Sequence, residues 1–472
     1  MRKFETKVEY LKYRVLKEVA RLAWRDELLE NFIEIPKTIA PGKIPTMRCC
    51  VYKERAILSE RVSLAIGGNR HNKKVIRTID IACEDCPAGG YEITSACRGC
   101  LAHRCKESCR KDAITIGHDQ KAYIDKTKCV ECGLCAKSCP FNAIHNYKRP
   151  CEQSCKIKAI SMGKDKEAVI DYENCLSCGA CVSACPFGAI TDRSYFLDVI
   201  DFLLHRENHE KVYALIAPSI AGQFPYVKFG QLISAIKALG FDEVYEVALG
   251  ADMVAECESK ELEEKGFLLS SCCPAFVSYV EKNFPQLKEH ISHNLSPAGT
   301  LAKYLKGKDA ACKTVFIGPC TAKKAERQRD EYKGLIDCVL TFDELQALID
   351  GKGLEMESFP EETLDHASPY GRRFAHSGGV AGAVKEALAE RGSTFEVKAI
   401  SCSGIDECRS ALSKKARGVL EANFIEGMAC AGGCVGGAGC LIHDEKNGLN
   451  VDRHGEEATH RTIQAALGQA LL

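Results

Sequence analysis

Three segments in the C-terminal half of the chain carry cysteines in contexts that suit iron–sulfur chemistry. They are Ser-Ser-Cys-Cys-Pro-Ala-Phe at 270–276, Gly-Pro-Cys-Thr-Ala-Lys-Lys at 318–324 and Glu-Gly-Met-Ala-Cys-Ala-Gly-Gly-Cys at 426–434. Soft thiolate ligands suit iron–sulfur centres, and four of them can hold one 4Fe–4S cubane. The segments offer that number in Cys273, Cys320, Cys430 and Cys434. Because these cysteines are far apart in the sequence, the fold itself must gather them.

A denser group of sixteen cysteines lies upstream, between positions 83 and 185. Four times the chain repeats the pattern Cys-x3-Cys-x3-Ala-Ile, which indicates an internally repeated ferredoxin region. In two-cluster ferredoxins the fourth cysteine of each run ligates the other cluster. This rule predicts a first set of Cys97, Cys100, Cys105 and Cys139, a second set of Cys109, Cys129, Cys132 and Cys135, and a third set of Cys155, Cys175, Cys178 and Cys181.

A fourth set can be assembled from the cysteines that remain. Cys151 and Cys185 are left over, and Cys83 and Cys86 form a Cys-x2-Cys pair that could join them. The sixteen cysteines would then bind four 4Fe–4S clusters. The alternative is that Cys83 and Cys86 are structural thiols.

Zinc and a histidine ligand are the other interpretations of these motifs. Zinc sites usually combine two Cys-x2-Cys pairs, whereas two runs here place three cysteines at x2 spacing before an x3-Cys, which favours iron–sulfur clusters. His103 lies between Cys100 and Cys105 and could be a ligand, although a solvent-facing loop residue is the favoured interpretation.

The overall composition narrows the class of protein. The 472 residues carry 64 basic and 64 acidic side chains, so the zero net charge gives no support for nucleic-acid binding. No run of 18 apolar residues suggests a membrane span, and the first residues are charged. Clustered cysteines at ligand spacing are typical of a reducing compartment, so we expect a cytoplasmic protein.

Three regions follow from the sequence pattern: an N-terminal helical or extended segment at 1–78, a ferredoxin-like region at 79–195 with α+β units, and a catalytic domain at 196–472. Apolar spacing predicts a helix within 1–35 that Pro36 and Pro41 end, and packing on the rest of the protein is favoured over partner docking. In the last region, expected strands at 212–217, 243–248, 267–270, 314–317 and 397–401 alternate with expected helices at 229–239, 276–283 and 297–305. This alternation predicts an α/β fold of parallel sheets with flanking helices, with the active-site cluster between lobes.

At these motifs the chain resembles the iron-only, or di-iron, hydrogenases, which interconvert protons, electrons and molecular hydrogen. The family patterns Thr-Ser-Cys-Cys-Pro, Pro-Cys-x-x-Lys-x-x-Glu and Glu-x-Met-Ala-Cys-x-Gly-Gly-Cys are recognisable over roughly residues 80–472. The resemblance implies that Cys273, Cys320, Cys430 and Cys434 hold a cubane. It also implies that Cys434 bridges to a di-iron unit with carbon monoxide, cyanide and an amine-containing dithiolate.

The resemblance further implies residues around that unit. Lys323 would offer an ammonium to one cyanide, and Ser219, in Ala217-Pro218-Ser219, would offer a donor to the other. Pro218, Pro297, Phe374 and Met428 would belong to the wall of the pocket, although ordinary core packing would also bury them. Partners implied in the same way are a ferredoxin-like electron carrier, the maturation enzymes for the di-iron unit and, as an open possibility, further redox subunits.

A proton path is also implied. Cys272 precedes a ligand and would be free to relay a proton, and Ser292, Glu258 and Glu261 would extend the path to solvent. Glu256 is an alternative to these glutamates, and a surface salt-bridge role is equally compatible with the sequence.

Several positions depart from the family pattern. Residues near the ligands differ from the family pattern at Ala275-Phe276, Gly318, Ala298 and Ala431. We therefore expect a divergent branch in which the reduction potential of the cluster or the catalytic bias is altered.

Two other functions compete with catalysis: a non-catalytic sensor or iron–sulfur assembly protein, and an electron-transfer subunit of a larger complex.

Overall fold

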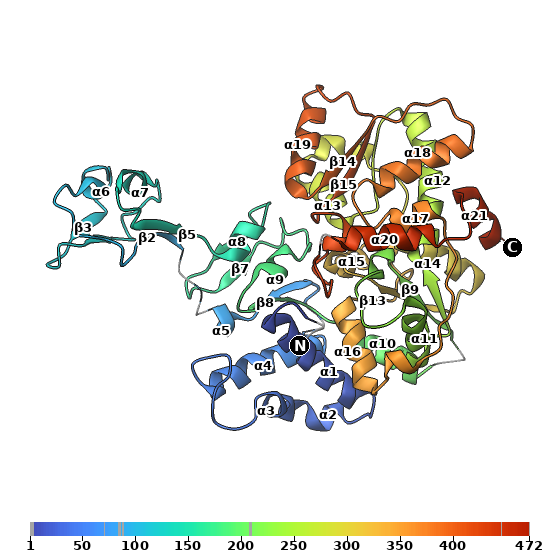
Figure 1. The fold of residues 1–472 in the computed structure, drawn as a ribbon, viewed down its shortest axis with the longest axis horizontal. Coiled ribbons are helices and arrows are strands. Elements are labelled where there is room, and N and C mark those ends of the chain that lie inside the picture. The colour runs from blue at the N-terminus through green and yellow to red at the C-terminus, as the bar shows by residue number, and fades with distance from the viewer. Residues whose placement is uncertain are drawn as a thin grey trace.

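A computed structural model describes residues 4–69, 71–83, 86, 89–206, 210–444 and 446–471. The charged residues 1–3, on which part of the expected cytoplasmic location depends, lie outside this range. Figure 1 shows a large α/β region from which two small ferredoxin-like units extend in sequence, with the N-terminal helices packed beside it.

Two parallel sheets form the α/β region, which confirms the fold class expected from the sequence. The larger sheet has the order β10-β9-β12-β13 and the smaller one β11-β15-β14, with every pair parallel. β9 is buried along its whole length, as strands covered on both faces are. The strands are β9 (Val212–Ile216), β10 (Glu243–Glu246), β11 (Leu268–Leu269), β12 (Lys313–Ile317), β13 (Cys338–Leu340), β14 (Ala399–Ser403) and β15 (Phe424–Met428).

Helices connect and cover these strands (Figure 1). They are α10 (Phe196–Leu204), α11 (Phe229–Leu239), α12 (Val247–Lys265), α13 (Pro274–Asn283), α14 (Pro297–Lys308), α15 (Thr321–Glu326), α16 (Phe342–Lys352), α17 (Pro369–Arg373), α18 (Gly379–Glu390), α19 (Ile405–Ala416), α20 (Asn447–Glu456) and α21 (Ile463–Leu471). Short 3-10 turns η2 (Pro218–Ile220) and η6 (Cys434–Gly436) lie at the site described below.

The ferredoxin-like region consists of two similar units. The distal unit pairs β2 (Gly90–Ile93) with β5 (Ile144–Tyr147) and β3 (Ile114–Ile116) with β4 (Ala122–Ile124), and it carries α6 (Arg104–Glu107) and α7 (Leu134–Ser138). The proximal unit pairs β1 (Ile76–Thr78) with β8 (Ile190–Asp192) and β6 (Ile160–Met162) with β7 (Ala168–Ile170), and it carries α5 (Asp80–Cys83), α8 (Pro150–Ser154) and α9 (Ala180–Ala184). The expected boundary after residue 78 therefore follows a strand that pairs with the proximal unit.

The repeated Cys-x3-Ala pattern has a local structural cause. In each of the four copies the alanine N–H donates a hydrogen bond to the Sγ atom of the cysteine four residues earlier, at 3.4, 3.4, 3.1 and 3.2 Å. The residue before each alanine has a positive φ, which turns the backbone back over the sulfur. These four turns involve Cys109–Ala113, Cys139–Ala143, Cys155–Ala159 and Cys185–Ala189.

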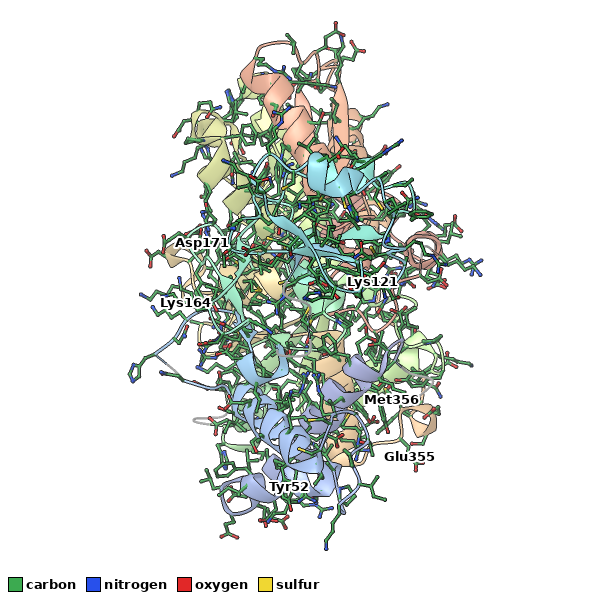
Figure 2. The ribbon with its side chains drawn as sticks, turned by 90° about the vertical axis from the view of Figure 1, so that its left-hand side faces the viewer. Tyr52, Lys121, Lys164, Asp171, Glu355 and Met356 are labelled. Atoms are coloured by element: carbon green, nitrogen blue, oxygen red, sulfur yellow. The ribbon has the colours of Figure 1, made fainter. Side chains whose placement is uncertain are left out.

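The N-terminal segment forms α1 (Lys7–Ala23), α2 (Leu28–Asn31), α3 (Ile35–Ile39) and α4 (Val51–Ala65). The buried face of α1 packs on α16, and Trp24 Nε1 donates to the carbonyl oxygen of Leu348 at 3.2 Å. Figure 2 shows this segment, marked by Tyr52, below the proximal unit with Lys164 and Asp171. The expected end of the first helix is wrong: α1 stops at Ala23, and Pro36 lies in the first turn of α3, which begins at Ile35, where its missing N–H costs nothing.

Candidate active site and iron–sulfur sites

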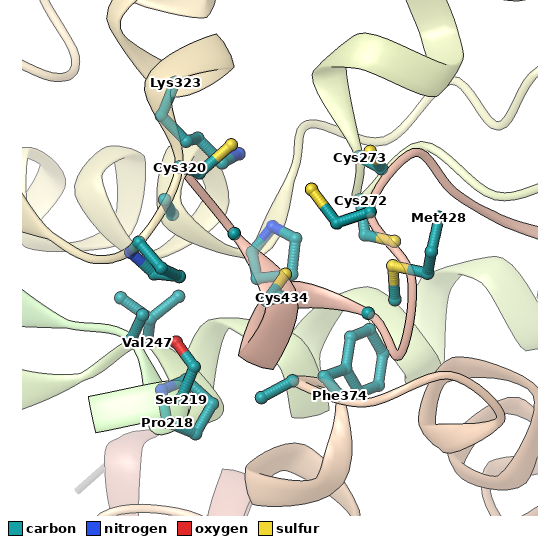
Figure 3. Close-up of a pocket in the computed structure, with 18 of the residues that line it drawn as sticks. Pro218, Ser219, Val247, Cys272, Cys273, Cys320, Lys323, Phe374, Met428 and Cys434 are labelled. Atoms are coloured by element: carbon teal, nitrogen blue, oxygen red, sulfur yellow. The ribbon is translucent and has the colours of Figure 1, made fainter. Parts of the chain in front are cut away.

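The four cysteines expected to hold the active-site cubane line one cavity between the two sheets (Figure 3). Cys273 follows β11 and Cys320 follows β12, and each is the residue before a helix; Cys430 follows β15 and Cys434 begins η6. Parallel strands direct their carboxyl ends to the same edge, and helix N-termini present free N–H groups to an anionic ligand. The empty volume of this cavity, including the part that opens to solvent, is about 750 Å³.

The cavity extends beyond the four cysteines. Its wall includes Pro218, Ser219, Pro297, Phe374 and Met428, so all five expected wall residues come together with the ligands. Figure 3 shows Ser219 on the opposite side of the space from Cys273. The Ser219 hydroxyl is fully buried and has no hydrogen-bond partner, a costly arrangement that a bound acceptor would relieve.

The chemistry of the donor set also fits a cluster. Burial raises the pKa of Cys320 to about 12, and burial together with the neighbouring thiols raises the pKa values of Cys430 and Cys434 above their ordinary range. Crowded thiols of this kind repel one another as thiolates, and a cationic iron–sulfur core removes that repulsion while it releases their protons. The residues present therefore fit an iron–sulfur cluster.

Lys323 lies in the same cavity on α15, one helical turn before Glu326. Its ammonium donates to both oxygens of Glu326, at 2.9 and 2.6 Å, and to Ser296 Oγ at 2.6 Å. Burial favours the neutral amine, but the attraction of Glu326 outweighs it and raises the pKa of Lys323. The expectations from single positions did not include Glu326 or Ser296, although Glu326 lies at the i+3 spacing that pairs helical side chains.

The residues of the expected proton path lie on α12 (Glu258 and Glu261), after β11 (Cys272) and after α13 (Ser292). Cys272 lines the cavity; the Glu258 carboxylate is completely buried and accepts hydrogen bonds from the N–H and Oγ of Ser271, both at 3.1 Å. The Ser292 hydroxyl donates to Glu261 at 3.2 Å, and Glu261 also accepts from the exposed Lys265 at 2.6 Å.

Burial dominates the electrostatics of these residues. It raises the pKa of Glu258 to about 7, against the hydrogen bonds from Ser271, and it raises the pKa of Cys272 well above the ordinary value for a thiol. Glu256 lies elsewhere, paired with Lys260 at 2.9 Å and bonded by Gln464 at 3.0 Å. The structure thus favours Glu258 and Glu261 over Glu256 as neighbours of the cavity.

Gly318 shows how one departure from the family pattern is accommodated. A Cβ atom at this position would lie 2.5 Å from Phe316 Cζ, so the Phe316 ring already occupies the space of a side chain. Phe316 also lines the cavity. The sequence did not single it out because it resembles any other apolar residue of a buried strand.

The first two cysteine sets belong to the distal unit. Burial raises the pKa of Cys105, and the neighbouring Cys100 and Cys139 raise it further, which places members of the first set side by side. All four cysteines of the second set, Cys109, Cys129, Cys132 and Cys135, line a single cavity. The Nε2 atom of His103 is buried without a partner, so its ring is less solvent-facing than expected.

The last two sets belong to the proximal unit. Burial raises the pKa of Cys181, and Cys178, Cys175 and Cys155 raise it further, so the third set is also gathered. Burial likewise raises the pKa of Cys151 to about 11, with contributions from Cys185 and Cys86, and Cys185 acts on Cys83 in the same way. The four cysteines proposed for the fourth set therefore lie near one another.

The spacing of these sulfurs does not suit a single ion. Thiolates around one zinc ion lie roughly 3.8 Å apart, as expected for tetrahedral bonds of about 2.3 Å. Among the residues that the structure describes, Glu5, Glu9 and His443 form the one group of three potential ligands whose atoms all lie within 4.8 Å. The cysteine sets are wider, as a cubane requires.

The third set adjoins the catalytic cavity. Burial raises the pKa of Cys178 to about 11, and the nearby Cys273 contributes to that shift; Cys178 in turn contributes to the raised pKa of the buried Cys430. Thr321 Oγ1 donates to the carbonyl oxygen of Ser177 at 2.7 Å, and Lys282 Nζ donates to that of Cys175 at 3.0 Å. The turn that carries Cys178 is therefore fixed to the helices that follow Cys273 and Cys320.

Comparison with known proteins agrees with this geometry. Residues 210–438 match the family described as iron only hydrogenase large subunit, C-terminal domain, and residues 122–145 and 168–191 match the 4Fe-4S binding domain. Iron hydrogenase 1 of Clostridium pasteurianum is 30% identical over 372 residues, which cover 67% of this chain and 64% of that protein. The chain is an iron-only hydrogenase-like protein that binds iron–sulfur clusters.

Two further similarities bear on the fold and on the length. The periplasmic [Fe] hydrogenase large subunit of Nitratidesulfovibrio vulgaris is 30% identical over 265 residues, covering 45% of this chain and 62% of that protein. A solved [FeFe]-hydrogenase structure, titled for oxygen inactivation of its H cluster, superposes with a TM-score of 0.51 at 20% identity and covers 59% of this chain and 93% of that one. The chain spans less than two thirds of the length of these curated hydrogenases.

A shorter segment of the chain is similar to proteins of a different class, the iron–sulfur cluster assembly factors. The cytosolic Fe-S cluster assembly factor NAR1 of Kluyveromyces lactis is 37% identical over 100 residues, or 21% of each chain. The hydrogenase similarity covers more of the chain. None of the helices in the described ranges has the length and apolar character needed to cross a membrane.

Proposed function

We propose that this protein interconverts protons and electrons with molecular hydrogen in the cavity between the two sheets. The observation that carries the proposal is the part of the cavity beyond the cysteines, where Ser219 has an unpartnered hydroxyl opposite the ligand thiols. A cubane alone would need the cysteines; this additional space and donor suit a second, smaller anionic group.

The residues assigned to that group have defined tasks. Cys273, Cys320, Cys430 and Cys434 would hold the cubane, and Cys434 would bridge to a di-iron unit with carbonyl, cyanide and azadithiolate ligands, which supplies the hydrogen chemistry when bound. Ser219 would donate its hydroxyl hydrogen to a cyanide. Lys323 would direct one ammonium N–H to the other cyanide, giving up one of its three bonds to Ser296 and Glu326. Pro218, Pro297, Phe374 and Met428 would exclude water.

Protons would reach the cavity along Cys272, Glu258, Ser292 and Glu261. The Glu258 carboxyl can exchange a proton near neutral pH because burial raises its pKa to about 7. Ser292 lies between the two carboxylates and can accept a proton from one as it donates to the other. Glu261, bonded by Lys265 and His293, would collect protons from the surface.

Electrons would travel through the ferredoxin-like units, with the third cysteine set next to the cavity and the distal unit in reach of a ferredoxin-like carrier. Maturation enzymes would supply the di-iron unit, and association with further redox subunits is compatible with this arrangement. Since five cubanes of four irons are expected, protein made without the maturation machinery should contain about twenty irons. A content near sixteen would remove one cluster from the proposal.

An iron–sulfur sensor or assembly function is the second candidate, and the NAR1 similarity favours it. Such a protein needs the cubane but neither a proton path nor a donor for cyanide. The presence of Cys272, Glu258 and Lys323 around the cavity supports catalysis instead.

Dye-linked hydrogen assays test the proposal. Protein matured with the di-iron unit should produce hydrogen from a reduced viologen, whereas protein made without maturation should not. Matured protein without turnover in either direction would favour the sensor or assembly function.

We also propose a cytoplasmic location, since unpaired cysteines of this number suit a reducing compartment, although one relative is named as periplasmic.

A further inference from the structure

Two buried arginines flank the fourth cysteine set. Arg149, one residue before Pro150 at the start of α8, is 1% exposed, and Arg61 on α4 is 5% exposed. Arg149 Nη2 donates to the carbonyl oxygens of Cys83, at 3.3 Å, and Lys166, while its Nε and Nη1 atoms have no partner. Arg61 Nη2 donates to the carbonyl oxygen of Gly188 at 2.5 Å, and its Nε atom has no partner.

Within the described ranges, no acidic side chain forms an ion pair with Arg61 or Arg149. Three other buried cations have carboxylate partners: Lys323 with Glu326 at 2.6 Å, Lys324 with Asp192 and Glu344 at 2.7 Å each, and Arg372 with Glu246 at 2.8 Å. A buried charge without compensation is costly, so an anion is expected beside these two arginines.

The nearest anionic candidates are the thiolates of the fourth set. Burial raises the pKa values of Cys83 and Cys151, while Arg149 acts on both in the opposite direction. Cys185 exerts the matching attraction on Arg61. Both arginines thus face the position where Cys83, Cys86, Cys151 and Cys185 would hold a cluster.

The local sequence of the Cys185–Ala189 turn allows Arg61 to lie close to its backbone. In the four Cys-x3-Ala turns, the residue before the alanine has a positive φ and is Asp112, Asn142, Lys158 or Gly188. A Cβ atom at Gly188 would lie 2.4 Å from Arg61 Nη2 and 2.6 Å from Val8 Cγ1. The absence of a side chain at Gly188 leaves the space next to the Cys185 turn that Arg61 and Val8 of the N-terminal segment occupy.

We propose that Arg61 and Arg149 are the counter-charges of the cluster held by the fourth set, and that they give this cluster the highest reduction potential of the four ferredoxin-type clusters. Reduction adds one electron, hence one negative charge, breaks no bond and moves no proton; the electron comes from the low-potential carrier. Two fixed positive charges in a poorly solvated site stabilise that added charge. The inference rests on the cluster set of the proposed function but not on hydrogen turnover.

Among the residues that the structure describes, the other three sets have no comparable cations. Lys282, which bonds the carbonyl oxygen of Cys175 in the third set, is exposed, and so are Arg98, Arg104 and Arg110 of the distal unit. Solvent and salt screen such charges. α8 and α9 each carry a cysteine of the third or fourth set and are followed by one of the other set, so the two clusters are neighbours. The fourth cluster would therefore stay reduced next to the third cluster, which adjoins the catalytic cavity. A stored electron at this place suits two-electron chemistry that is supplied by one-electron carriers.

Potentiometric titration monitored by electron paramagnetic resonance tests this proposal in full-length protein made without maturation, with dithionite as reductant. The signal of the fourth cluster is assigned by its loss in Cys151→Ser. In the unsubstituted protein it should be the first ferredoxin-type signal to appear on reduction. In Arg149→Gln and in Arg61→Gln, the ratio of reduced to oxidised cluster at the original midpoint should fall at least about tenfold, which corresponds to 59 mV for one electron.

Two controls sharpen the result. Arg149→Lys keeps the charge and should restore the midpoint to within about twofold, and the exposed Arg104→Gln, one residue before Cys105, should shift no signal by more than that. If Arg149→Gln loses four irons while Arg149→Lys keeps them, the counter-charge role is supported directly, and Arg61→Gln still reports the potential. Unshifted midpoints in both glutamine variants, a first signal that survives Cys151→Ser, or sixteen irons in the unsubstituted protein would overturn the proposal, whatever the hydrogen activity.

Discussion

In the ferredoxin-like units, each cysteine set comes from short stretches of chain with fixed spacing, whereas the catalytic cavity collects its ligands from loops at the ends of two separate sheets. The units hold their sulfurs through local turns with N–H···S bonds. The cavity holds them through the packing of β11, β12 and β15 and the helices that follow. A ligand in the units therefore depends on local sequence, and a ligand in the cavity depends on the whole α/β fold.

The largest contrast should come from removing one ligand in each region. Cys430→Ser should abolish hydrogen turnover and damage the cavity cubane, because the cluster would lose one of its four thiolate ligands. Cys132→Ser, at an exposed position of the distal unit, should cost up to four irons yet leave turnover with a small viologen dye nearly unchanged, since the dye can reach inner clusters. Iron analysis and dye-linked assays measure both effects. Equal loss of dye-linked turnover would show that the two regions are not independent.

A buried ion pair that joins the proximal unit to the α/β region should contribute more to the free energy of unfolding than an exposed ion pair of the distal unit. Lys324 joins α15 to Asp192 of the proximal unit and to Glu344 of α16, and all three side chains are buried. Lys324→Ala leaves the buried Glu344 without its cation, while Asp192 keeps Lys12 at 2.6 Å, and should lower the free energy of unfolding by about 3 kcal/mol. Lys126→Ala, which removes an exposed pair with Glu131 at 3.9 Å, should change it by no more than about 0.5 kcal/mol.

Urea denaturation followed by circular dichroism compares the two lysine variants. A loss in Lys324→Ala as small as that in Lys126→Ala would mean that the buried network is not what fixes the proximal unit to the α/β region.

Cys272→Ser separates proton relay from cluster assembly. The serine is nearly isosteric but too weak an acid to relay in the same way, so iron content should be unchanged while turnover falls at least about a hundredfold. Cys273→Ser, one position along, should instead damage the cluster. Turnover equal to the unsubstituted protein in Cys272→Ser would mean that protons arrive by another route.

The smallest effect concerns the pH dependence set by Glu258. Burial raises its pKa to about 7, so the carboxyl holds its proton below that pH and can donate it, and it loses the proton as pH rises through 7. Hydrogen production should therefore exceed that of Glu258→Gln by roughly tenfold below pH 7, with the ratio narrowing above it. Glu256→Gln, on the same helix but paired with Lys260, is the control and should follow the unsubstituted profile. A ratio that does not change with pH would exclude Glu258 as the titrating group.

The difference between the two regions also explains what the sequence could predict. Ligand spacing reaches only a few residues, so candidate ferredoxin sets could be grouped from the sequence, whereas the fourth set around Cys151 was assembled from the cysteines that remained and stays a prediction. The strands β9, β11, β12 and β14 follow apolar runs and were expected within a few residues. β13 and β15 were not, because Cys-Val-Leu is very short and Phe-Ile-Glu-Gly-Met carries a buried glutamate that interrupts the apolar pattern.

Contacts between distant segments could not be predicted. The partners of Lys323, the hydrogen bond from Gln464 to Glu256 and the ring of Phe316 in the space of Gly318 all depend on tertiary packing. The break after Ala23 was missed because the residues that follow it are also compatible with a helix; their short helices pack separately.

Infrared spectroscopy of the matured protein tests the central claim most directly. If the cavity holds a di-iron unit beside the cubane, carbonyl and cyanide bands should be present, and Ser219→Ala should shift a cyanide band because it removes the buried hydroxyl donor. Arg98→Gln in the distal unit should leave the bands unchanged. Matured protein with a full set of cubanes but no carbonyl or cyanide bands would contradict the proposed function and would leave a cavity built for a cubane alone.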